Sequence, residues 1–100
     1  MKLFVDDTRD FPCGDFECCR DAKSAKILLS AMKFELVSLD YSLGHNRETG
    51  LSILMWMKEN DIFVPEIVIH SNNIKGKERM KKFCEENFPD SKVTMWELSK

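Results

Sequence analysis

Three short apolar runs that stop abruptly at polar residues, with helix-like segments between them, limit the possible folds more than any other feature. The runs cover residues 3–5, 35–40 and 66–70 and have the form of strands buried on both faces. Weaker strand patterns cover residues 16–19 and 92–96. Strands that alternate with helices are typical of a parallel sheet with crossover connections.

Three segments between these runs have helical periodicity. Asp21 is placed to cap the first, the second covers about residues 49–60, and the third covers about residues 77–88. Residues 8–15 contain a proline and a glycine and are too few for a crossover helix, so we expect a loop as the first connection. The sequence therefore predicts one α/β domain over residues 1–100, a three-layer sandwich with helices on both faces of a flavodoxin-like parallel sheet of about five strands.

The charge balance and the cysteines exclude several classes of protein. Fifteen basic and seventeen acidic residues give a net charge of -2, which does not favour an extended nucleic-acid surface or an anionic membrane. No apolar run approaches the roughly 18 residues of a membrane span, and Asp6 and Asp7 interrupt the first run too early for a signal peptide. The four cysteines lack a C-x-x-C spacing. We therefore expect a cytoplasmic domain with free thiols.

Acidic residues end two of the apolar runs. In a doubly wound sheet, ligands bind beyond the carboxyl ends of the strands, where the strand order reverses. If the first and third strands are neighbours, Asp6, Asp7 and Asp40 face one small space, and their mutual repulsion favours a bound Mg²⁺. The alternative is that Asp6 and Asp7 only end a strand and hydrogen-bond the next loop.

Two further side chains suit a phosphate at the same edge. Arg9 follows the acid pair closely, and its planar guanidinium fits a phosphate, or else forms a salt bridge with those acids. His70 ends a strand and can transfer a proton near neutral pH, or else is a hydrogen-bonded structural residue.

The segment after His70 offers groups for an anion at a helix N-terminus. Ser71, Asn72 and Lys75 supply a hydroxyl, an amide and an ammonium group. The alternative is an asparagine cap followed by solvated lysines, and both can hold at once.

Three ordered motifs resemble a known family. They are residues 6–9 (DDTR), residues 38–44 (SLDYSLG) and residues 70–73 (HSNN) with a following Gly76 and Met80. The chain resembles a response-regulator receiver domain, and more closely its divergent branch, the cyclic-phosphate processing receiver-like domains. That resemblance implies a receiver-like parallel sheet and action on, or binding of, cyclic phosphates or related nucleotide ends.

The resemblance also implies roles for individual residues. Asp6 and Asp7 would hold Mg²⁺, Asp40 would accept a phosphoryl group, and Ser71 or His70 would contact it. The chain departs from the pattern at two places. No lysine ends the fifth strand, and Tyr41-Ser42 stands where the branch commonly has His-Asp.

We therefore expect a Mg²⁺-dependent, phosphate-handling domain. It would either bind a cyclic phosphate or nucleotide phosphoester or hydrolyse it as a phosphoesterase. The predicted catalytic residues are Asp40, His70 and Ser71. The predicted phosphate-binding residues are Arg9, Ser71, Asn72 and Lys75.

One alternative is a stand-alone signalling receiver, phosphorylated on Asp40, that acts through a partner protein. Another is a non-catalytic module that binds a nucleotide or a partner.

Overall fold

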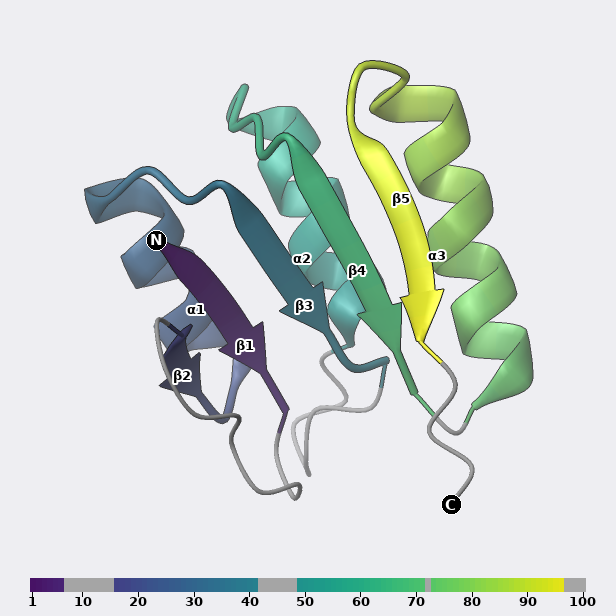
Figure 1. Cartoon of the computed structure of the whole chain (residues 1–100), viewed down its shortest axis with the longest axis horizontal. Helices are drawn as coiled ribbons and strands as arrows, with labels where there is room; N and C mark the ends of the chain where they lie inside the picture. Colours follow the sequence, from purple (N-terminus) through teal and green to yellow (C-terminus); the bar gives the residue numbers. More distant parts are fainter. Residues whose placement is uncertain (7–15, 42–48, 72, 97–100) are drawn as a thin grey trace.

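A five-stranded parallel sheet forms the centre of the molecule (Figure 1). The computed structural model describes residues 1–6, 16–41, 49–71 and 73–96. The strand order is β2-β1-β3-β4-β5, and each neighbouring pair is parallel. The predicted receiver-like α/β fold is confirmed. The strands are β1 (Lys2–Val5), β2 (Phe16–Cys19), β3 (Leu36–Leu39), β4 (Glu66–His70) and β5 (Lys92–Trp96), and the helices are α1 (Ala22–Ala31), α2 (Gly50–Glu59) and α3 (Ile74–Asn87).

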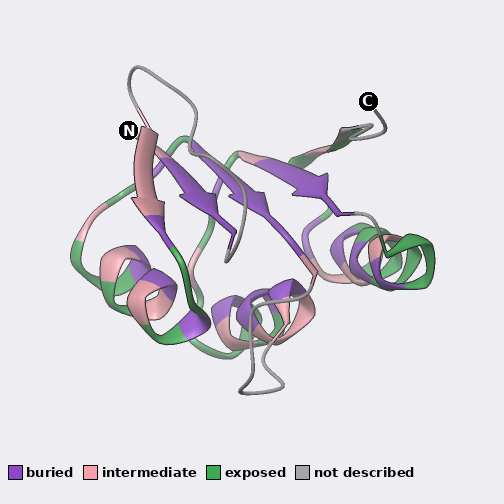
Figure 2. Cartoon of the chain, turned by 90° about the horizontal axis from the view of Figure 1, so that it is seen from below, coloured by how far each residue is buried: buried purple, intermediate pink, exposed green. Residues whose placement is uncertain are grey.

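The three described helices all cover the same face of the sheet (Figure 2). The connections β2 to β3, β3 to β4 and β4 to β5 all progress in one direction across the sheet. Right-handed crossovers that progress in one direction place their helices on one face. Only the connection from β1 to β2 runs the other way, and residues 7–15 of it lie outside the described part of the chain. The expected second layer of helices is therefore not found among the described residues, and the loop expected at residues 8–15 is not described either.

Side chains of the strands alternate between the two faces. One set faces the helices and packs with their apolar residues in the core. The strand residues of this core are Leu3, Val5, Val37, Leu39, Ile67 and Ile69, and the helix residues are Ala25, Leu29, Ile53, Leu54, Met57, Met80 and Cys84. The intervening positions, Phe4, Ser38, Val68 and His70, are buried as well. The sheet thus has an apolar face under the helices and a second face that contains polar residues.

Each helix begins at a side chain that caps its free backbone N–H groups. Asp21 caps α1 and accepts a hydrogen bond from the Ser24 backbone N–H at 2.7 Å, as predicted. Thr49 caps α2 in a reciprocal arrangement with Ser52. Asn73 caps α3. These polar residues fix where the helices start and hence how α2 and α3 approach the carboxyl edge of the sheet.

The described cysteines are free thiols, as expected. Burial raises the pKa of Cys19 and of Cys84 to about 12, so both thiols are protonated at neutral pH. Cys13 lies outside the described residues. No helix in the described ranges combines the length and the apolar character needed to cross a bilayer.

Candidate active site at the carboxyl edge of the sheet

Two buried carboxylates follow the ends of adjacent strands. Asp6 comes directly after β1 and Asp40 directly after β3, and 0% and 7% of their surfaces are exposed. The Asp6 backbone N–H donates to the carbonyl of Cys19 at 3.2 Å, and that of Asp40 donates to the carbonyl of Val5 at 3.1 Å. The sheet hydrogen bonds therefore continue past the strand ends and fix both residues. This edge is also the switch point of the strand order, where ligands bind in α/β sheets.

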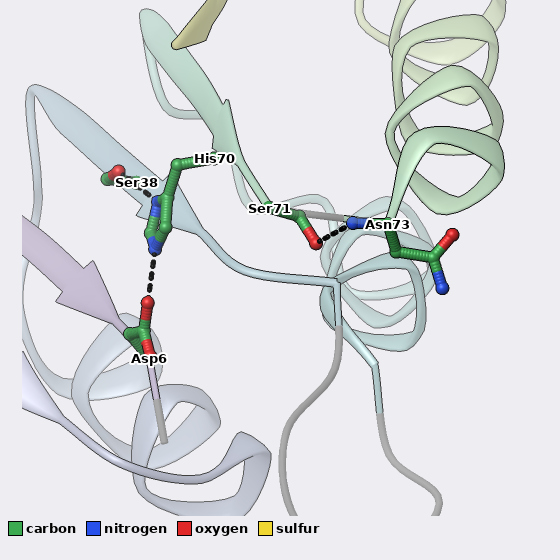
Figure 3. A network of polar contacts seen from close by, with 5 residues as sticks. All are labelled: Asp6, Ser38, His70, Ser71 and Asn73. Atoms are coloured by element: carbon green, nitrogen blue, oxygen red, sulfur yellow. Dashed lines mark hydrogen bonds and ion pairs between the residues drawn. The ribbon is translucent and has the colours of Figure 1, made fainter. Parts of the chain in front are cut away.

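A buried chain of hydrogen bonds runs from Asp6 through His70 to Ser38 (Figure 3). Asp6 Oδ2 lies 3.0 Å from His70 Nε2, and Ser38 Oγ lies 2.7 Å from His70 Nδ1. All three residues are fully buried. The Phe4 ring stacks on the imidazole with 4.7 Å between centroids and 6° between planes. The imidazole, which belongs to β4, is therefore held at both nitrogens and on one ring face by Ser38 of β3, by Phe4 of β1 and by Asp6, which follows β1.

The register of the sheet explains why these side chains meet. Phe4 is opposite Ser38, and Ser38 is opposite Val68. Asp6 lies two residues after Phe4, and His70 lies two residues after Val68, so alternation places all of them on the same face. Ser38 was not among the predicted site residues. The signal for it is a single polar side chain inside an otherwise apolar buried strand.

His70 lies where both of its nitrogens contact protein groups. This is the hydrogen-bonded arrangement that the sequence left as the alternative to a proton-transferring residue. In this geometry the His70 ring contacts the carboxylate of Asp6, the residue that directly follows β1. A role of His70 toward a phosphate stays a prediction.

The segment between β4 and α3 shows the predicted helix cap. The Ser71 hydroxyl is buried and accepts a hydrogen bond from the Asn73 backbone N–H at 3.1 Å (Figure 3). The Asn73 side chain in turn accepts from the Gly76 backbone N–H at 2.8 Å. Lys75 is exposed in the first turn of α3. The phosphate-binding roles of Ser71 and Lys75 stay predictions, while Asn72, Arg9 and Asp7 lie outside the described residues.

Two glycines let the beginnings of α2 and α3 approach the end of β3 closely. The Gly50 backbone N–H donates to the carbonyl of Tyr41 at 2.9 Å, and a Cβ at Gly50 would lie 2.4 Å from the carbonyl oxygen of Asp40. A Cβ at Gly76 would lie 2.3 Å from Cγ of Tyr41. The Met80 side chain of α3 also packs against the start of α2, because its methyl group would be 2.6 Å from a Cβ at Gly50. Both positively polarised helix ends thus lie next to the Asp40 segment.

The donor set at this edge suits a hard divalent cation. Asp6 and Asp40 supply carboxylate oxygens from neighbouring strands, which are about 4.8 Å apart in sheets. Mg²⁺ binds through one or two carboxylates and keeps several waters for a phosphate. Residues 1–6, 16–41, 49–71 and 73–96 contain no group of three metal-binding side chains. Asp7, the third predicted ligand, lies outside these ranges.

Comparisons with known proteins agree with this geometry. The chain has no match among curated proteins. A solved structure of a response regulator from Burkholderia pseudomallei, described as containing a phosphorylated aspartic acid, a calcium ion and citrate, matches with a TM-score of 0.66 and 17% sequence identity. The match covers 99% of this chain and 60% of that chain, so this chain spans less than two thirds of its length, and the likeness establishes the fold. The sequence model of the cyclic-phosphate processing receiver domain matches residues 1–86. This chain therefore belongs to the cyclic-phosphate processing receiver domain family.

Proposed function

We propose that this chain is a Mg²⁺-dependent domain that hydrolyses a cyclic phosphate or a related nucleotide phosphoester. The observation that carries this proposal is the pair of buried carboxylates, Asp6 and Asp40, at the ends of adjacent strands and at the switch point of the sheet. Membership of a cyclic-phosphate processing family supports the substrate class. A response regulator of similar fold, described as containing a phosphorylated aspartic acid and a calcium ion, supports the pairing of a cation with a phosphoryl group in this fold.

The chain's own residues have distinct tasks in this proposal. Asp6 and Asp40, with Asp7, hold the cation, which when bound offsets charge on phosphoryl oxygens and acidifies a water. Because both ring nitrogens of His70 contact protein groups, the task of His70 in this proposal is to hold the Asp6 carboxylate through Nε2.

The rim of the site then binds the phosphate. Ser71 and Lys75 lie where the N-terminus of α3 favours an anion, and Asn72 lies in the same segment. Arg9 supplies a guanidinium that can bind two phosphate oxygens at once. Of these groups, the described Ser71 and Lys75 take no part in the hydrogen bonds that join Asp6, His70 and Ser38.

Incubation with a panel of 2′,3′- and 3′,5′-cyclic nucleotides, with Mg²⁺ or Mn²⁺, tests the proposal. We expect a ring-opened product by ³¹P NMR, and we expect Asp40→Asn to abolish it because one carboxylate is lost. Glu59→Gln, an exposed acid at the far end of α2, is the matched control and should retain activity. No product and no ligand binding across the panel would contradict the proposal. Tight binding without product would instead identify a non-catalytic binding module.

A second candidate is a stand-alone receiver that is phosphorylated on Asp40 and acts through a partner protein. The position of Asp40, directly after β3 and beside the N-termini of α2 and α3, favours this candidate. Incubation with acetyl phosphate and Mg²⁺, followed by intact-mass measurement, should then show a labile gain of one phosphoryl group. Asp40→Asn should not gain it, whereas Glu59→Gln should.

A further inference from the structure

Packing alone does not account for the serine in β3. Ser38 is the polar member of a strand whose four residues are all buried, and it lies between Phe4 and Val68 in register. A buried hydroxyl needs a hydrogen-bond partner, and that of Ser38 has His70 Nδ1 at 2.7 Å.

The contact between His70 and Asp6 determines which ring nitrogen carries the proton, and Ser38 supplies the partner that this tautomer needs. A neutral imidazole has one donor nitrogen and one acceptor nitrogen. A carboxylate oxygen only accepts, so Nε2 must be the donor toward Asp6 Oδ2. Nδ1 is then the acceptor, and it needs a donor in a fully buried position. The Ser38 hydroxyl supplies that donor, whereas an apolar residue could not.

We propose that Ser38 is a positioning residue that acts through His70 to fix the Asp6 carboxylate for cation binding. This inference rests on the proposed function, in which Asp6 is a ligand. The hydrogen bond from Nε2 uses one oxygen of a group that has about four lone-pair positions, and it restrains rotation of that group. Partners that orient a ligating side chain in this way typically change metal affinity by 10- to 100-fold when they are removed.

A purely structural role of Ser38 makes a different prediction. In that case the hydroxyl only links β3 to β4, and its loss lowers thermal stability without changing cation affinity. Ser91 offers a matched control, because its hydroxyl donates to the Val64 carbonyl at 2.8 Å and links the start of β5 to the segment before β4. Ser91→Ala therefore removes a part-buried side-chain hydrogen bond at the amino ends of the strands, away from the candidate site.

The experiment measures Mg²⁺ affinity by calorimetry and the tautomer of His70 by ¹⁵N NMR on the full chain. We expect Ser38→Ala to weaken Mg²⁺ binding by about 10- to 100-fold. Ser38→Thr, which keeps the hydroxyl, should restore most of the affinity. Ser91→Ala should lose thermal stability but keep the wild-type affinity. If Ser38→Ala does not fold, Ser38→Cys replaces it, since a thiol is a weak donor of similar size.

The NMR measurement gives a readout that a structural role would not change. We expect the Nε2–H tautomer in the wild-type chain, with Nδ1 as a hydrogen-bonded acceptor. In Ser38→Ala the Nδ1 signal should shift to that of an acceptor without a donor, and His45→Gln is used to assign the signals. Wild-type Mg²⁺ affinity in Ser38→Ala, or the Nδ1–H tautomer in the wild-type chain, would overturn the inference. If the wild-type chain binds no Mg²⁺, the proposed function fails, and the tautomer still decides whether Ser38 orients His70.

Discussion

Replacement of Gly76 by alanine should be destabilising in the wild-type chain and stabilising when Tyr41 is also replaced. In the wild-type chain, the new Cβ would lie 2.3 Å from Cγ of Tyr41 and 2.6 Å from both Cδ atoms. These atoms belong to the base of a ring and not to the end of a flexible chain, so either the ring or the helix must move. Over-packing of this kind costs about 1–3 kcal/mol.

A helix propensity term opposes that cost. Alanine is favoured over glycine by up to about 1 kcal/mol inside a helix, and Gly76 is the third residue of α3. The net effect of Gly76→Ala is therefore a loss of about 0–2 kcal/mol in the free energy of unfolding. When Tyr41→Ala removes the ring, only the propensity term remains. The same substitution should then increase stability by up to about 1 kcal/mol.

The assay is a double-mutant cycle with urea unfolding of the wild-type chain, both single variants and the double variant. We expect an interaction energy of about 1–3 kcal/mol between positions 41 and 76, equal to the over-packing cost. Additive effects of the two substitutions would refute the argument, because they would mean that the ring does not rest on the helix at Gly76. Asp40 precedes Tyr41, so the cycle also measures how firmly α3 holds the candidate site.

Two further substitutions test the polar parts of the fold. His70→Ala should lower the free energy of unfolding by about 3–5 kcal/mol in urea titration, because it removes a buried partner from the Asp6 carboxylate, and a loss below about 1 kcal/mol would contradict this. Asp21→Ala should cost about 1 kcal/mol at neutral pH through loss of the cap. The hydrogen bond from the Ser24 backbone N–H lowers the pKa of Asp21, so this contribution is present above the unfolded-state pKa and is lost as the pH falls through the folded-state pKa. A difference between Asp21→Ala and wild type that persists or grows at low pH would contradict the argument.

Much of the fold can be predicted from the sequence because burial produces strong local patterns. The runs at residues 35–40 and 66–70 are largely apolar and end in polar residues, and the structure has the buried strands β3 and β4 there. The placement of the helices could also have been derived. Right-handed crossovers that all progress in one direction place their helices on one face, as α1, α2 and α3 lie in the described part of the chain. The expectation of helices on both faces did not take the direction of these three crossovers into account.

The site is harder to predict because it depends on register and on close approaches. The sequence places Asp6 and Asp40 at strand ends, and the strand order brings those ends together. The partnership of Ser38 with His70 needs the register between β3 and β4, which a single sequence does not specify. The approach of Gly50 to the Asp40 carbonyl likewise depends on how α2 docks on the sheet.

Register also links the stability of the sheet to the chemistry proposed for its edge. Side chains alternate along a strand, so a shift of one residue between β4 and its neighbours would move His70 to the face covered by helices and bring Ile69 toward the polar face. Asp6 would then lose its contact with the ring, and a buried apolar position would receive a polar side chain. The same hydrogen bonds that orient Asp6 therefore also penalise the wrong register, which joins a folding role and a functional role in one buried network.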